Sequence, residues 1–165
     1  MRKISLLLLV IALTPVLAVA QSSEQRRLQG YVFAAPGGIS AVGNTAASLH
    51  AGIGGEGLLY KGLGAGAEVG YLFPTRAAGD GIGIFSANGS YHFVGSSKPR
   101  KVVPFVTAGY SRAFGQGGFN MINYGGGVNW WMRDRLGLRL EARDHVTTDT
   151  PRGHFWQFRV ALAFR

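Results

Sequence analysis

The chain ends with the stretch His154-Phe-Trp-Gln-Phe-Arg-Val-Ala-Leu-Ala-Phe-Arg165, in which large apolar side chains alternate with small or polar ones. Successive side chains of a β-strand point to opposite faces of its sheet. One face of this strand therefore carries Trp156, Phe158, Val160, Leu162 and Phe164. The other face carries Gln157, Arg159, Ala161 and Ala163. The pattern suits a strand over a soluble core, and it equally suits a barrel wall with lipid outside and polar groups inside.

The first 20 residues have the anatomy of a secretory signal peptide. Arg2 and Lys3 give a positively charged start, residues 4–13 are almost entirely apolar, and Ala18-Val-Ala20 is a small-residue cleavage box. A polar stretch begins at Gln21, directly after that box. We therefore expect an exported protein in which residues 1–20 are removed and residues 21–165 form one domain. An uncleaved N-terminal anchor is disfavoured, because the cleavage box and the change in polarity coincide.

The composition describes a basic, glycine-rich domain without disulfide bonds. The chain has 26 glycines, no cysteine and a formal net charge of +9, which falls to +7 when Arg2 and Lys3 leave with the signal peptide. A basic surface favours contact with anionic lipid headgroups. Nucleic acid is a poorer partner, because the charges are dispersed and the sequence has no basic helix or RNA-binding aromatic motif. After the signal peptide, no apolar run reaches the roughly 20 residues of a transmembrane helix.

Seven further segments repeat the period of two, with turn signals between them. They cover residues 29–34, 47–59, 63–73, 82–94, 102–114, 119–132 and 136–146. The first segment is short, and Pro36-Gly-Gly38 followed by Gly43-Asn44 predicts a loop over residues 36–45. Further loops are expected at 74–81, 115–118 and 147–153, and tighter turns at 60–62, 95–101 and 133–134. Eight strands with short connections predict an all-β, antiparallel, up-and-down barrel.

The second face of these strands decides between a soluble and a transmembrane barrel. That face is mostly glycine, alanine, serine, asparagine and threonine, whereas a solvent-facing surface is usually rich in charged residues. An eight-stranded barrel has room inside only for its own side chains, so small residues suit its interior. Six charged residues share the face: Glu56, Glu68, Arg139, Glu141, Arg143 and Arg159. Because buried charges need partners, we expect these residues to pair in a network inside a transmembrane barrel.

Aromatic residues gather near the predicted strand ends, as in the two girdles at the lipid–water boundaries of a transmembrane barrel. One group, near the short turns, is Tyr60, Tyr91, Phe93, Trp130, Trp131 and Phe164. The other, near the opposite ends, is Phe73, Phe114, Phe119 and Trp156. The general preference of aromatic residues for strands explains their presence but not this bias towards the ends.

The sequence resembles small bacterial outer-membrane β-barrel proteins of the OmpX-like type. The signal peptide, the eight alternating segments and the terminal array from Trp156 to Phe164 carry the resemblance. The run Gly125-Gly-Gly-Val-Asn-Trp-Trp131, followed by Arg135-Leu-Gly-Leu-Arg-Leu-Glu-Ala-Arg143, looks like the penultimate hairpin of the outer membrane protein β-barrel domain families. The resemblance implies a location in the bacterial outer membrane with both termini on the periplasmic side. It also implies contact with outer-membrane lipids, including lipopolysaccharide.

The same resemblance gives the terminal strand a second role. It implies that the array of Trp156, Phe158, Val160, Leu162 and Phe164 is the signal read by the outer-membrane assembly machinery. In the family the last residue of the strand is aromatic, whereas here Arg165 follows Phe164.

These patterns favour a structural outer-membrane protein with a side-chain-filled polar interior. A narrow channel or small-solute-binding barrel is one alternative, although eight strands leave little room for a pore. A lipid-modifying enzyme such as a lipid A deacylase is another. The resemblance to such enzymes would require a His-x-Ser pair on the outer wall, which is missing at His50, His92, His145 and His154. A soluble exported β-barrel is the remaining alternative.

No residue is nominated as catalytic, cofactor-binding or metal-ligating. The four histidines lack the close spacing of metal ligands. The stretch Gly52-Ile-Gly-Gly-Glu-Gly57 matches a dinucleotide-binding spacing, but no strand–helix–strand unit surrounds it. We therefore expect no cofactor and no enzymatic activity.

Overall fold

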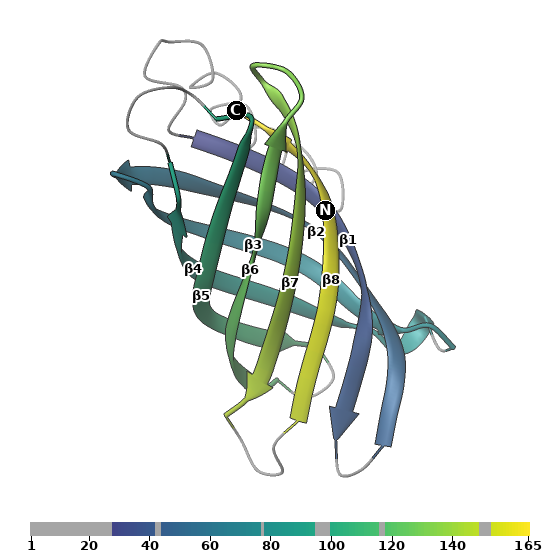
Figure 1. Cartoon of the computed structure of the whole chain (residues 1–165). Coiled ribbons are helices and arrows are strands. Elements are labelled where there is room, and N and C mark those ends of the chain that lie inside the picture. Colours follow the sequence, from purple (N-terminus) through teal and green to yellow (C-terminus); the bar gives the residue numbers. More distant parts are fainter. Residues whose placement is uncertain (1–27, 42–43, 77, 95–99, 116–117, 149–152) are drawn as a thin grey trace, which may run out of the picture.

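The computed structural model describes residues 28–41, 44–76, 78–94, 100–115, 118–148 and 153–165. It forms a closed barrel of eight strands in chain order, and every neighbouring pair is antiparallel, including β1 with β8 (Figure 1). The strands are β1 Leu28–Ala41, β2 Asn44–Tyr60, β3 Leu63–Pro74, β4 Ile82–His92, β5 Val102–Phe114, β6 Asn120–Trp131, β7 Leu136–Thr147 and β8 Gly153–Phe164. A single turn of 3-10 helix, η3 (Ala78–Asp80), lies between β3 and β4. The prediction of an eight-stranded up-and-down barrel is therefore confirmed.

Some of the segments predicted from the sequence lie outside the described residues. The expected signal peptide, residues 1–20, lies outside the described residues, as do parts of the connections expected at 95–101, 115–118 and 147–153. Within the described ranges, no helix is long and apolar enough to cross a membrane.

The first strand is longer than its sequence predicts, and the loop expected from Pro36 is wrong. β1 continues to Ala41 and keeps its pairing with β2 throughout. Its pairing with β8 lapses between Ala34 and Gly37, so Pro36, which has no N–H to donate, lies at the gap in that ladder. Gly38 faces the indole of Trp156, and a Cβ there would come within 2.8 Å of the ring. The Pro-Gly-Gly sequence therefore accommodates a neighbouring side chain within a strand rather than marking a loop.

The tight turns fall close to their predicted positions. Lys61 and Gly62 form the β2–β3 turn with positive φ angles of 44° and 91°. A side chain on Gly62 would also meet the carbonyl oxygen of His92, so this position requires glycine. Residues 132–135 connect β6 to β7, around the expected turn at 133–134. The other boundaries shift by one to three residues, as at β2, which begins at Asn44.

The apolar face of the strands points outward. In β8, exposed and buried residues alternate without interruption, with Phe158 61% exposed and Arg159 3% exposed. Large apolar side chains are likewise exposed along the other strands, as at Ile53, Phe85 and Ile122. A soluble barrel would bury this face and expose the polar one. The barrel is therefore inverted relative to a soluble protein, as a lipid-facing wall requires.

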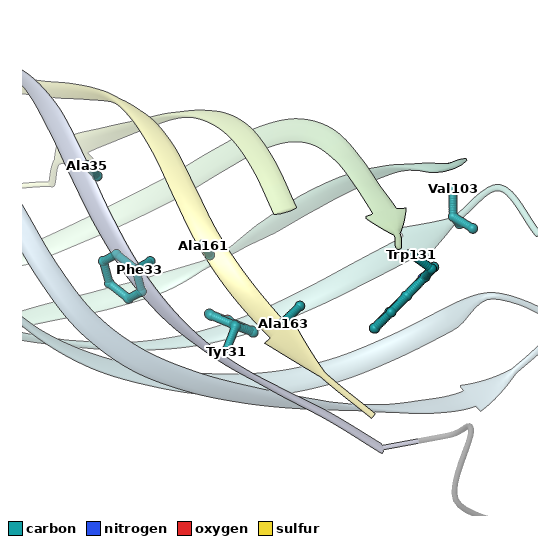
Figure 2. Close-up of a cluster of buried hydrophobic side chains, with 7 residues drawn as sticks. All are labelled: Tyr31, Phe33, Ala35, Val103, Trp131, Ala161 and Ala163. Carbon is teal, nitrogen blue, oxygen red and sulfur yellow. The ribbon is translucent and has the colours of Figure 1, made fainter. Parts of the chain in front are cut away.

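Two apolar clusters lie inside the barrel, one towards each end. The first, at the end that holds the C-terminus of β8, contains Tyr31, Phe33, Ala35, Val103, Trp131, Ala161 and Ala163. Figure 2 shows Tyr31 and Phe33 on β1 near Ala161 and Ala163 on β8, with Val103 and Trp131 farther along the barrel. The second contains Leu72, Ile84, Ala113, Met121 and Phe155, with Phe119 packed against it. The alternation of β6 turns Trp131 inward, and Phe119, just before β6, packs partly buried against the second cluster. The assignment of these two residues to the outer aromatic girdles is therefore wrong.

Candidate functional site

The structure places the six charged residues of the inward face together inside the barrel. Glu56 comes from β2, Glu68 from β3, and Arg159 from β8, while β7 supplies the other three as Arg139, Glu141 and Arg143. Each is between 2% and 8% exposed. They meet because β7 presents every second residue to the interior, and because Glu141 on β7 is in register with Arg159 on β8.

Glu68 receives more charged donors than any other carboxylate in this group. Arg159 donates from Nη1 to Glu68 Oε2 and from Nη2 to Oε1, each over 2.8 Å. Arg143 Nη1 donates to Oε1 over 2.7 Å, and the hydroxyl of Tyr31 donates to Oε2 over 3.0 Å. The pairing of Arg159 with Glu68 is therefore bidentate, which is the strong form of a charged hydrogen bond.

Glu141 joins two of the arginines on its own strand. Arg143 Nε lies 2.5 Å from Glu141 Oε1, and Arg139 Nε lies 3.2 Å from Oε2. Arg139 then reaches β2, where its Nη1 lies 3.2 Å from Glu56 Oε1. The ion pairs therefore form one unbroken chain from Arg159 to Glu56, with three negative and three positive side chains and no net charge. We call these six residues the charged layer.

Three further side chains complete the charged layer around Glu56. Ser90 Oγ donates to Glu56 Oε2 over 3.0 Å, and His92 Nε2 lies 2.8 Å from Oε1. Gln29 Nε2 also donates to Oε1. None of these three partners was predicted from the sequence, although Ser90 and His92 stand on the inward face of a predicted strand. Gln29 and Tyr31 escaped notice because the alternation of the short first segment is ambiguous.

The charged layer also contacts three buried aromatic rings, two of which, Tyr31 and Phe33, belong to the first apolar cluster. The guanidinium carbon of Arg139 lies 3.8 Å from the ring centre of Phe105 and 4.9 Å from that of Tyr31. That of Arg159 lies 4.1 Å from the ring centre of Phe33. Aromatic faces attract cations, so these rings add to the stabilisation of the arginines.

A second, neutral layer occupies the interior between the charged layer and the second apolar cluster. His50 Nδ1 lies 3.0 Å from the side-chain amide of Gln157, and Ser86 and Ser111 share a hydrogen bond of 2.8 Å. The ring of His145 stacks on Phe155 with 5.1 Å between centres. Neither ring nitrogen of His145 has a hydrogen-bond partner among the described residues. We call these residues, with Asn123, the neutral layer.

A small polar cluster lies on the outer wall near the end opposite the C-terminus. Asp144 Oδ2 accepts a hydrogen bond of 3.2 Å from the hydroxyl of Tyr124 and lies 2.9 Å from His154 Nδ1. The described residues contain no group of three or more histidine, aspartate or glutamate side chains placed to hold a metal ion. The expected absence of a metal site stays a prediction for the whole chain.

Comparison with solved structures shows which proteins share this barrel. Neisserial surface protein A superimposes with a TM-score of 0.70 at 14% sequence identity, over 83% of this chain and 96% of that one. This chain has the fold of the small bacterial outer-membrane β-barrels. The N-terminal barrel domain of Pseudomonas aeruginosa OprF matches with a TM-score of 0.53 at 15% identity, over 81% of this chain and 97% of that one.

A third solved structure has the same fold, and sequence comparisons add no relative. Ail of Yersinia pestis, solved in complex with the heparin analogue sucrose octasulfate, matches with a TM-score of 0.51 at 9% identity, over 84% of this chain and 98% of that one. No protein-family model and no curated protein matches the sequence. The expected OmpX-like fold is confirmed, and the identities limit the likeness to the fold.

Proposed function

We propose that this protein is a structural component of the bacterial outer membrane, with a barrel that spans the lipid and an interior closed by its own side chains. The observation that carries the proposal is the inverted barrel: apolar residues such as Phe158 and Ile53 face outward, and the charged layer faces inward. Only a lipid surrounding makes that arrangement favourable, because exposing so much apolar surface to water is costly.

The charged layer supports a closed interior rather than a pore. The chain of ion pairs joins β2 and β3 to β7 and β8 across the interior, and the two apolar clusters lie on either side. A water-filled path would require these pairs to separate, and removing one partner of a buried ion pair costs about 3–5 kcal/mol. The channel alternative is therefore disfavoured.

The remaining expectations are part of the same proposal. Both ends of the barrel chain, Leu28 and Phe164, lie at the end that faces the periplasm in the proposed orientation, and the opposite end would meet lipopolysaccharide. The exposed row from Trp156 to Phe164 on β8 is available to the assembly machinery, in keeping with a role as the assembly signal. Removal of residues 1–20 on export also belongs to the proposal.

Cell fractionation and gel migration test the location. The expressed protein should sediment with the outer membrane, and the folded barrel should migrate differently in unboiled and boiled samples. Recovery as a soluble periplasmic protein would overturn the proposal. N-terminal sequencing of the recovered protein should begin at Gln21.

Two further measurements test the role. Purified protein in planar bilayers should give no discrete conductance, whereas steady single-channel currents would favour the channel alternative. The mass of lipid A should not change when the protein is overexpressed. A loss of one acyl chain would instead show a lipid-modifying enzyme.

A further inference from the structure

The two ends of the barrel carry different charges. At the end that holds Leu28 and Phe164, the described residues outside the interior include six basic side chains and a single acidic one, Asp134. The basic ones are Lys61, Arg100, Lys101, Arg133, Arg135 and Arg165. At the opposite end, Arg76 and Arg112 are balanced by Asp80 and Asp144. One end of the described structure is therefore strongly positive and the other nearly neutral.

Most of the positive charge gathers in one sector, where β5 begins, β6 turns into β7, and β8 ends. The backbone joins these segments directly: Trp131 N donates to the carbonyl of Lys101 over 2.7 Å, and Arg165 N donates to that of Arg135 over 3.2 Å. The Arg165 guanidinium lies 4.0 Å from the ring centre of Trp131. Lys101, Arg133 and Arg135 are exposed, and none forms an ion pair with a described carboxylate. Because Trp131 lies in the interior and Arg165 Nε also donates to the carbonyl of Asp134 over 2.9 Å, Arg165 turns towards the barrel mouth. We call Lys101, Arg133 and Arg135, which are exposed, the basic rim.

A shallow groove of about 330 Å³ lies on the outer wall of the same three strands, β6 to β8. Two rows of outward residues that pair across the three strands line it. One row is Gly126, Ala142 and Phe158, and the other is Val128, Leu140 and Val160. The wall is hollow at Gly126 and Ala142 because those residues carry little or no side chain, while Phe158 stands beside them 61% exposed. The groove is therefore apolar and faces the lipid.

The distance between the groove and the basic rim matches a phospholipid. Five residues separate Val128 from Arg133 and Leu140 from Arg135, which is roughly 16 Å along a strand. With the usual tilt of barrel strands, this is roughly 12–13 Å across the bilayer. The hydrocarbon core is about 30 Å thick, so a chain anchored at the rim reaches the groove near the middle of the membrane.

We propose that the basic rim and the groove together bind one anionic phospholipid, with its phosphate-bearing headgroup at the rim and one acyl chain in the groove. The inference rests on the proposed membrane-spanning role of the barrel. Arginine side chains in the β6–β7 turn suit a phosphate because each offers paired N–H donors. The outward Trp130, 48% exposed beside the turn, sets the height of the rim at the lipid–water boundary. The lipid belongs to the leaflet that meets the C-terminal end of the barrel.

Native mass spectrometry of the folded barrel in a non-ionic detergent tests the site, with phosphatidylglycerol as the ligand and phosphatidylcholine of the same chains as the neutral comparison. Phosphatidylglycerol should give a saturable adduct of one lipid per barrel and bind more tightly than phosphatidylcholine. The double variant R133Q/R135Q should weaken phosphatidylglycerol binding roughly fivefold for each arginine removed at low salt. Ala142→Phe, which fills the groove without changing charge, should also weaken it several-fold.

Matched variants separate this site from general attraction to lipid. R76Q/R112Q removes two arginines from the opposite end, and Ala67→Phe adds a ring to another exposed alanine of the outer wall, on β3. Both should bind phosphatidylglycerol as the unaltered protein does. Equal binding of the two lipids, or full binding by Ala142→Phe, would overturn the inference. The heat-dependent gel shift is recorded for every variant, and a barrel that never shows it would contradict the proposed function instead.

Discussion

The half of the interior nearer the C-terminal end holds full charges, whereas the other half holds neutral polar and aromatic side chains. In the charged layer, every carboxylate has at least two donors, and Glu68 has three charged or hydroxyl partners. In the neutral layer, His145 packs by stacking and leaves both ring nitrogens without a partner among the described residues. The interior of one barrel thus holds two kinds of side-chain packing. The charged layer depends on complete pairing of its ionic groups, whereas the neutral layer depends mainly on how well its side chains fit together.

Removal of Glu68 should show the largest difference between the two layers. Glu68→Ala leaves Arg143 and Arg159 without their shared carboxylate, and we expect a loss of about 3–5 kcal/mol in the free energy of unfolding. Ser86→Ala in the neutral layer removes one hydrogen bond and should cost about 1 kcal/mol. Urea unfolding of both variants in lipid vesicles measures the difference. Equal costs would show that the charged layer contributes no more than the neutral one.

A double-mutant cycle should show whether the charged layer acts as a unit. Glu68→Gln and Arg159→Gln each break the bidentate ion pair, and the double variant replaces both charged groups with neutral amides. We expect a coupling free energy of about 2 kcal/mol, because the residues contact each other directly. The same cycle on Ser111 and Asn123, joined by a hydrogen bond of 2.9 Å, should give a smaller value. Additive costs at Glu68 and Arg159 would contradict a coupled network.

The histidines allow a matched comparison of the layers. His145→Phe should change the free energy of unfolding by less than about 1 kcal/mol, because the ring makes a stacking contact and no hydrogen bond among the described residues. His92→Phe removes a group 2.8 Å from Glu56 and should destabilise the barrel by about 1–3 kcal/mol. Thermal unfolding of the two variants side by side tests this order. A more harmful substitution at His145 would indicate a buried polar contact for that ring.

The outer wall should give the smallest effect and serves as a reference. Tyr124→Phe removes only the exposed hydrogen bond to Asp144, so we expect a change within about 0.5 kcal/mol. The measurement is urea unfolding under the conditions used for Glu68→Ala. A cost as large as that of Ser86→Ala would show that the outer polar cluster stabilises the barrel as much as the neutral layer does.

The sequence was most informative where both faces of a strand were distinctive. In β7 and β8, large apolar residues alternate with charged, polar or small ones, so the period of two predicts the strand and the inward face together. β1 was harder to predict, because Pro36, Gly37 and Gly38 carry turn signals whose meaning depends on β8: the gap in its ladder and the ring of Trp156. A local pattern does not contain that information.

The contacts between residues of the charged layer could not be predicted from the sequence for a similar reason. Alternation predicts that Glu68 and Arg159 share the interior, but they are 91 residues apart and meet only through the closure of the barrel. Trp131 and Phe119 were hard to place because an aromatic side chain suits a lipid-facing girdle and a barrel interior equally well. The groove and the basic rim depend on register between strands, which one sequence does not specify.

The distribution of the charged layer along the chain also bears on how the barrel closes. Strands β2 and β3 carry two of its carboxylates, whereas β7 and β8 carry its three guanidinium groups and its third carboxylate. If the sheet were open between β1 and β8, the layer would carry a charge of −2 on β2 and β3, near one edge, and +2 on β7 and β8, at the other. These charges cancel only when β1 pairs with β8. Closure of the sheet therefore brings Glu56 and Glu68 on β2 and β3 next to the net positive charge of β7 and β8, and opposite charges at this separation attract each other.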